Sequence, residues 1–61
     1  MHTYEISVYR GGRWWMIYVP EIDELTQARH VGETEDMARS LIAVSTETPI
    51  ADIGVRVVKR D

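Results

Sequence analysis

The fold of this chain is decided by the stretch Gly11-Gly12-Arg13-Trp14-Trp15-Met16-Ile17-Tyr18-Val19-Pro20. Two glycines open it, residues with a high strand propensity follow, and a proline, which cannot donate to a strand ladder, closes it. Successive side chains of a strand point to opposite faces, so Trp14 and Trp15 must lie on opposite sides of the sheet. Large apolar groups on both sides predict that each side is covered.

The segments around this strand predict a small mixed sheet with one helix. Residues 3–10 alternate between apolar and polar side chains, and Gly11-Gly12 suits a tight hairpin with positive φ angles, so residues 3–10 and 14–19 should pair antiparallel. Residues 25–30 predict a weaker third strand, and residues 53–58 predict the last one. The element order is β-β-β-α-β. A right-handed crossover should place the last strand beside the first and parallel to it, which gives the spatial order 3-2-1-4.

The single predicted helix lies between the third and the last strand. Thr34 is its candidate N-cap, and Glu35 and Asp36 follow where the helix dipole favours negative charge. The helix should run to about Ser45, and the Thr-Glu-Thr-Pro segment at 46–49 should end it. Its predicted apolar stripe consists of Met37, Ala38, Leu41, Ile42 and Val44.

Alternation along the strands assigns the sheet residues to two faces. The face under the helix should hold Tyr4, Ile6, Val8, Trp15, Ile17, Val19, Val55 and Val57. The open face should show Glu5, Ser7, Tyr9, Trp14, Met16, Tyr18 and Arg56. A register slip of one residue would exchange the two sets, because the side-chain period of a strand is two.

Size and composition indicate a small α+β domain that needs support from association. The 61 residues form a single domain, 1–61, without cysteine, so neither disulfides nor a thiolate metal site can stabilise the core. A formal charge of −3 argues against nonspecific binding to nucleic acid. No apolar run approaches the roughly 18 residues of a membrane span. We therefore expect a cytoplasmic protein that forms homo-oligomers and does not bind membranes.

Five segments taken together resemble the HicB-like antitoxin family of bacterial toxin–antitoxin modules. They are Tyr4, Gly12-Arg13-Trp14-Trp15, Tyr18-Val19-Pro20-Glu21, Thr26-Gln27-Ala28 and Thr34-Glu35-Asp36-Met37-Ala38. The resemblance covers nearly the whole chain, and it implies a degenerate ribonuclease-H-like fold. It also implies that the chain binds and neutralises a HicA-type toxin, a small mRNA interferase.

The chain departs from the family pattern in two places. Relatives have a Pro-Gly-Cys turn where this sequence has Glu24-Leu25 after a longer polar stretch. Many relatives also carry a C-terminal DNA-binding domain, and none is expected within residues 1–61. Direct binding to nucleic acid is therefore not expected.

The residue pattern predicts no catalytic residue, no metal site and no cofactor. His2 and His30 are too far apart in sequence to suggest a metal pair, and no serine or cysteine has the flanking glycines of a nucleophile elbow. A ribonuclease-H-like nuclease is the enzymatic alternative, and it would need several carboxylates around divalent metal ions. The candidates are Glu5, Glu33, Glu35, Asp36 and Asp52. The helix dipole and solvation account for these acids better, so we expect a protein without enzymatic activity.

The predicted functional surface is an interface with another protein. The candidate residues of a partner or dimer interface are Tyr9, Trp14, Met16, Tyr18 and Arg56. Aromatic residues and methionine are enriched at interface cores, which favours this reading over simple filling of an open sheet face. The candidate acids for contact with a basic toxin are Glu5, Glu21, Asp23 and Glu24. The alternative function is a stand-alone homo-oligomeric structural or regulatory domain without a toxin partner.

Overall fold

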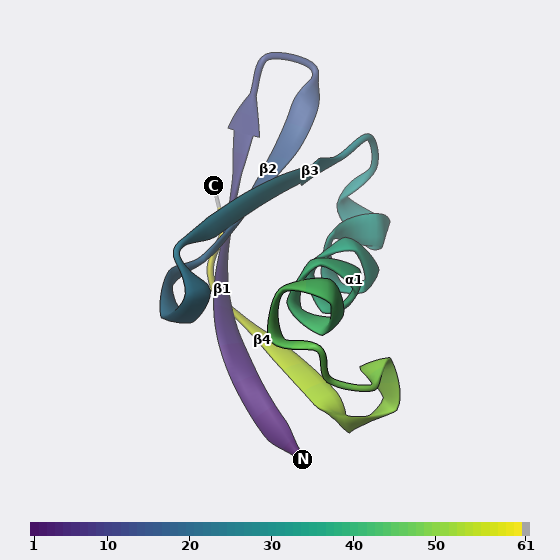
Figure 1. Ribbon diagram of the computed structural model, residues 1–61. Coiled ribbons are helices and arrows are strands. Elements are labelled where there is room, and N and C mark those ends of the chain that lie inside the picture. Colours follow the sequence, from purple (N-terminus) through teal and green to yellow (C-terminus); the bar gives the residue numbers. More distant parts are fainter. Residues whose placement is uncertain (61) are drawn as a thin grey trace.

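The computed structural model describes residues 1–60, in which α1 packs on one face of a four-stranded mixed sheet (Figure 1). The elements are β1 (His2–Gly11), β2 (Trp14–Val19), β3 (Glu24–Ala28), α1 (Thr34–Thr46) and β4 (Ile53–Arg60), joined by the 3-10 turns η1 (Pro20–Ile22), η2 (Val31–Glu33) and η3 (Ile50–Asp52). The strand order is β3-β2-β1-β4, and β1 and β4 are parallel. The predicted α+β class, element order and sheet order are confirmed.

The β1–β2 hairpin closes as predicted, but its two glycines have different roles. Gly12 has a φ of +66°, a conformation that glycine adopts without the steric cost of a side chain. Gly11 does not have a positive φ, contrary to the prediction. A Cβ at Gly11 would meet Cγ of Met16 at 2.7 Å, so Gly11 is required for close approach. The hairpin extends past the end of α1 (Figure 1).

The third strand is shorter than the predicted 25–30 segment. Pro20 starts η1, where its fixed φ and missing N–H are tolerated, and Asp23 ends the turn in the left-handed conformation with a φ of 50°. The strand then runs from Glu24 to the buried Ala28, paired antiparallel with β2. Arg29 and His30 are exposed and lie in the turn that leads toward α1, so they are not part of the sheet.

The last strand pairs with β1 in parallel and contains one irregularity. The register runs from His2–Ile53 to Ile6–Val57, and the next partner of Ser7 is Lys59. Val58 is therefore an extra residue in β4, and its side chain is half exposed. Strict alternation along β4 would have placed Val58 on the face of the sheet away from α1. Beyond this bulge, Lys59 takes the position opposite Ser7.

The core lies between the sheet and α1. The sheet contributes Tyr4, Ile6, Val8, Ile17, Val19, Ala28 and Ile53, and α1 contributes Ala38 and Ile42. Trp15, Val55 and Val57 are partly buried and pack against this cluster. The predicted division of the strands into a covered and an open face is therefore confirmed.

Two predictions about α1 are wrong. Thr34 is the first helical residue rather than the N-cap, because η2 leads directly into the helix, and its hydroxyl donates to the carbonyl of Val31 at 2.8 Å. The buried line of the helix consists of Thr34, Ala38 and Ile42. Met37 and Val44, which were expected in the apolar stripe, are 38% and 79% exposed. The small side chain of Ala38 faces the sheet, and the larger Met37 lies on the flank.

The helix ends as predicted at the Thr-Glu-Thr-Pro segment, but in a costly conformation. Glu47 adopts the left-handed region with a φ of 54°, and the N–H of Thr48 donates to the carbonyl of Ala43 at 3.1 Å. This is the geometry of a Schellman ending, whose left-handed position usually belongs to glycine. A glutamate here has a strained backbone and a negative charge at the negative end of the helix dipole.

Candidate protein-binding surfaces

The open face of the sheet carries the predicted interface residues on neighbouring strands. We use the name open face for Glu5, Ser7, Tyr9, Trp14, Met16, Tyr18, Leu25, Gln27 and Arg56. Met16 lies between Tyr9 and Gln27, and Tyr18 lies between Ser7 and Leu25. Tyr9 and Leu25 are 37% and 49% exposed, and Trp14, Met16 and Tyr18 are partly buried. Four of the five predicted interface residues therefore form one apolar surface with Leu25, which the sequence reasoning did not include.

Close packing within the open face explains why its large side chains are only partly exposed. Met16 lies over Gly11, which has no side chain to displace it. The Tyr18 hydroxyl donates a 2.7 Å hydrogen bond to Oδ1 of Asp23. This hydrogen bond raises the pKa of Tyr18 above its usual value, because ionisation would remove the donor and set a second negative charge beside the carboxylate. The face is thus preorganised by contacts within the chain.

Each of the four acids predicted to face a toxin has a partner in its own chain. Glu5 forms an ion pair with Arg56, and Glu21 is 2.8 Å from Nε2 of His2. Asp23 accepts the Tyr18 hydroxyl. Glu24 pairs in the sheet with the buried Val19 and accepts a 3.1 Å hydrogen bond from Ser45 of α1, so it lies on the helix side. The structure therefore brings Glu5, Glu21 and Asp23 to one end of the open face and separates Glu24 from them.

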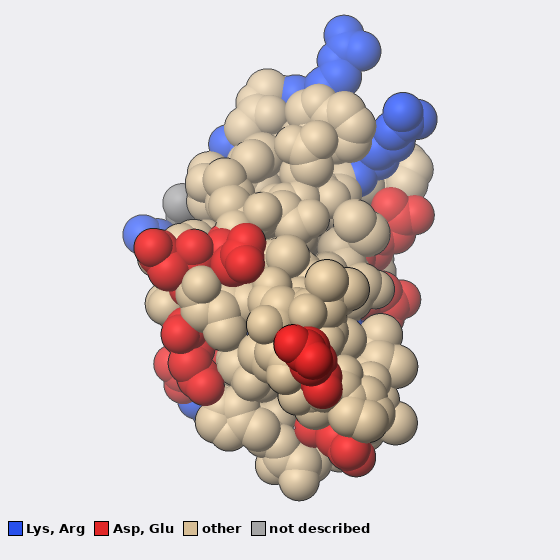
Figure 2. All heavy atoms as spheres, viewed as in Figure 1, with Lys and Arg blue, Asp and Glu red and all other residues tan. Residues whose placement is uncertain are grey.

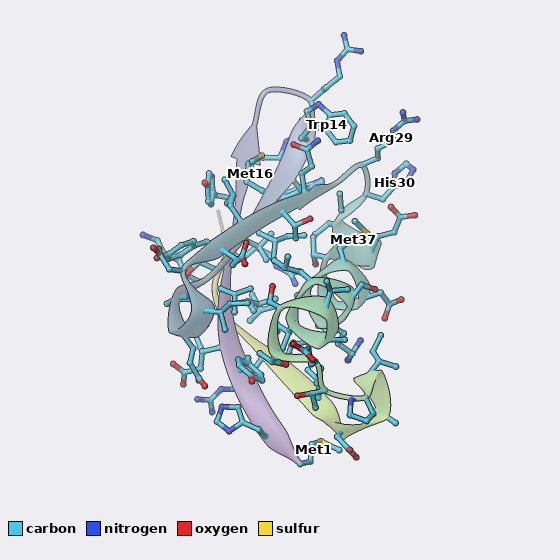
Figure 3. The ribbon with its side chains drawn as sticks, in the orientation of Figure 1. Met1, Trp14, Met16, Arg29, His30 and Met37 are labelled. Atoms are coloured by element: carbon cyan, nitrogen blue, oxygen red, sulfur yellow. The ribbon has the colours of Figure 1, made fainter. Side chains whose placement is uncertain are left out.

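The hairpin end of the sheet is basic and aromatic. Residues 6–20 contain no carboxylate, although the chain has ten. Arg10 lies over the Trp15 ring at 4.9 Å, and Arg29 lies over the Trp14 ring at 5.5 Å. A shallow hollow is lined by Arg13, Trp14 and Arg29. Figure 3 labels Trp14 and Arg29 and shows Arg29 extending beside Trp14. Within residues 1–60 neither Arg13 nor Arg29 forms an ion pair.

Sequence reasoning missed the pairing of Arg29 with Trp14, which depends on the β2–β3 register. A cation held over an indole ring typically contributes about 0.5–1 kcal/mol at an exposed site. The signal available in the sequence was the absence of acids between positions 6 and 20. That signal indicates a basic end but does not reveal which residue from another strand joins it.

The helix side of the molecule has the opposite charge. We use the name helix layer for residues 31–52, which contain five carboxylates and one arginine. Arg39 lies 2.8 Å from Asp36 and 3.6 Å from Glu35, and Glu33, Glu47 and Asp52 form no ion pair within residues 1–60. Figure 2 shows carboxylates over the middle and lower parts of the molecule and two basic side chains projecting at the top.

Exposed apolar side chains lie between the acids of the helix layer. Met37 and Val44 are two turns apart on one flank of α1, and Ile50 is 52% exposed in η3. The acids Glu33, Glu35 and Asp36 precede this flank, and Glu47 and Asp52 follow it. The helix layer thus combines an apolar strip with negative charge at both ends.

A metal site, a nuclease site and a membrane-spanning helix would each place specific requirements on residues 1–60. Within that range no three His, Cys, Asp or Glu side chains lie close enough together to hold a metal ion. The acids considered for a nuclease are divided between the layers, with Glu5 on the open face and the others in the helix layer. In the same range no helix is both long and apolar enough to cross a membrane.

Comparison with known proteins adds no family assignment. No family model, no characterised protein and no solved structure matches this chain. Charge, exposure and packing therefore carry the functional argument.

Proposed function

We propose that this chain is a protein-binding module of the HicB-like antitoxin type, with a degenerate ribonuclease-H-like fold, that neutralises a small basic HicA-type toxin by direct binding. The observation that carries the proposal is the helix layer, where five carboxylates and one arginine surround exposed Met37 and Val44. A basic RNA-binding surface is complementary to this layer in charge. Covering that surface would exclude RNA without any chemistry by the antitoxin.

The distribution of charge favours the helix layer over the open face as the toxin-binding side. The open face and its two ends carry Arg13, Arg29, Arg56 and Lys59 against Glu5, Glu21 and Asp23, so this side has no acidic excess. The helix layer, with five carboxylates and one arginine, has a clear acidic excess. Complementary charge raises association rates and selects partners, and it acts most strongly where the charges are not already paired.

The conformation of Glu47 supports the same side. A residue that breaks a local rule without an evident structural gain motivates a hypothesis of function. Glu47 breaks two rules, because it occupies a left-handed position and places a carboxylate at the C-terminal end of α1. Contact with a cationic partner would offset both costs.

The test is co-expression with a HicA-type toxin encoded in the neighbouring reading frame, read out as recovery of growth and co-purification. The variant Glu33→Gln/Glu47→Gln/Asp52→Asn should weaken binding at least tenfold. The matched control Glu5→Gln/Glu21→Gln/Asp23→Asn also removes three charges, from the other side, and should bind almost normally. The assignment to the helix layer fails if the control is the weaker binder, and the antitoxin proposal fails if the wild-type chain neither binds the toxin nor restores growth.

A further inference from the structure

The open face has a charge order along its strands in addition to its apolar centre. Arg13 and Arg29 lie at the hairpin end, and Glu21 and Asp23 lie at the η1 end. Between them, the register defines two apolar rows that cross the strands, one through Met16 and one through Tyr18. The two rows are about 7 Å apart, because residues on one face alternate along a strand.

This order limits how two copies of the face can pack against each other with two-fold symmetry. An axis parallel to the strands would place each basic end over the other basic end. An axis across the strands reverses the strand direction, so each basic end meets an acidic end. Only the second arrangement is self-complementary, as an interface between identical surfaces requires.

The positions along β2 and β3 match under this rotation. With the axis midway between the two rows, the Met16 row of one copy lies over the Tyr18 row of the other. Trp14 then lies over Pro20. Arg29 and Asp23 flank the two ends of the edge strand β3, each three positions from the axis and on opposite sides of it. Arg13 in the hairpin turn and Glu21 in η1 lie beyond the two ends of β2, so the basic end of each copy meets the acidic end of the other.

We propose that a second copy of this chain occupies the open face, rotated about a two-fold axis that crosses the strands between the Met16 and Tyr18 rows. The apolar rows form the centre of the dimer, and the arginine–carboxylate pairs form its ends. Gly11 contributes by letting Met16 lie low on the face, so that the second copy can approach. The helix layers point outward, where each remains accessible to a toxin, so this inference goes beyond the proposed function and is compatible with it.

The size of the face places the dimer among weak interfaces. The face spans four strands about 4.8 Å apart. Along the strands it spans four rows about 7 Å apart, which pass through Trp14, Met16, Tyr18 and Pro20, so its footprint is roughly 20 by 25 Å. Two such footprints bury on the order of 1,000 Å², which is at the low end for specific interfaces. We therefore expect a dissociation constant in the range of about 1–100 μM, within reach of analytical ultracentrifugation.

Charge exchange between two variants tests the orientation. Arg13→Glu/Arg29→Glu makes both ends of one chain acidic, and Glu21→Lys/Asp23→Lys makes both ends of the other basic. Each variant alone should dimerise at least tenfold more weakly than the wild type, and an equimolar mixture should recover the wild-type affinity. Arg10→Glu is the matched control, because Arg10 belongs to the same hairpin but lies over Trp15 on the other face. The proposal fails if the wild type is monomeric at 1 mM, if Arg10→Glu weakens dimerisation equally, or if mixing restores nothing.

Methionine methyl signals give a second test that uses only the wild-type protein and therefore does not depend on whether a variant folds. On dilution, the Met16 methyl resonance should shift with the monomer–dimer equilibrium, and the Met37 resonance should not. Added toxin should shift Met37. A shift of Met37 without any effect of dilution on Met16 would overturn the dimer and leave the antitoxin function standing, whereas the opposite result would overturn the toxin site alone.

Discussion

Replacing Glu47 by glycine should stabilise the protein, which is unusual for a charged surface residue. The left-handed conformation costs a residue with a Cβ about 1–2 kcal/mol relative to glycine. Removing a negative charge from the C-terminal end of α1 adds about 0.3–1 kcal/mol. The greater freedom of glycine in the unfolded chain takes back about 0.5 kcal/mol. The expected net gain in the free energy of unfolding is about 1–2.5 kcal/mol, and for a domain of this size each kcal/mol raises Tm by roughly 4–8 °C.

Urea and thermal unfolding of the wild type, Glu47→Gly and Glu47→Ala separate the two causes. Alanine removes the charge but keeps the Cβ, so its gain should be about 0.3–1 kcal/mol and should largely disappear at high salt. The gain from glycine should persist in salt. If Glu47→Gly is no more stable than Glu47→Ala, the backbone at this position is not strained and the reasoning is refuted. Both variants should bind toxin more weakly than the wild type, because both lack the carboxylate.

Three further predictions follow from single contacts. Ile42→Ala removes a fully buried side chain between α1 and the sheet and should cost about 2–5 kcal/mol, enough to unfold much of so small a domain at 37 °C by circular dichroism. Asp23→Asn should lower the pKa of Tyr18 in an absorbance titration, and an unchanged titration would contradict the hydrogen bond. The raised pKa of Tyr18 in the folded state gives stability that is present below the unfolded-state pKa and is lost as Tyr18 ionises at alkaline pH. The variant should therefore lose less stability at alkaline pH than the wild type. Gly12→Ala should cost about 1 kcal/mol through its positive φ alone, and Gly32→Ala, which has equal space but no positive φ, should cost nothing in the same denaturation assay.

Local patterns were sufficient to predict most of the sheet. The alternation in residues 3–10 and 14–19, interrupted by Gly11-Gly12, predicted the hairpin and both faces correctly. Parallel addition of the last strand beside the first followed from chain connectivity, because a single helix must return the chain to the sheet. These features depend on residues close in sequence or on topology with few alternatives.

The candidate surfaces could be predicted only in part. The aromatic set on the open face followed from alternation, but Leu25 joined it through the β2–β3 pairing, which the weak third strand did not reveal. The bulge at Val58 changed the facing of the last residues of β4, because one extra residue reverses alternation. Of the four carboxylates chosen for their position in sequence, Glu5, Glu21 and Glu24 proved to have partners from distant segments, and Asp23 has one five residues away.

The sequence by itself determined the element order, the β1–β2 hairpin and the inward or outward facing of the residues in β1, in β2 and in β4 before its bulge, because these depend on side-chain period and on local backbone preferences. Only the tertiary structure decided which side of α1 faces the sheet, since a helix packs where the small Ala38 permits close approach rather than where Met37 and Val44 are most apolar. It also decided that Arg29 covers Trp14 and that basic and acidic ends face opposite ways along the open sheet. Such relations join residues from different strands, and their distances are fixed only when the whole sheet is assembled.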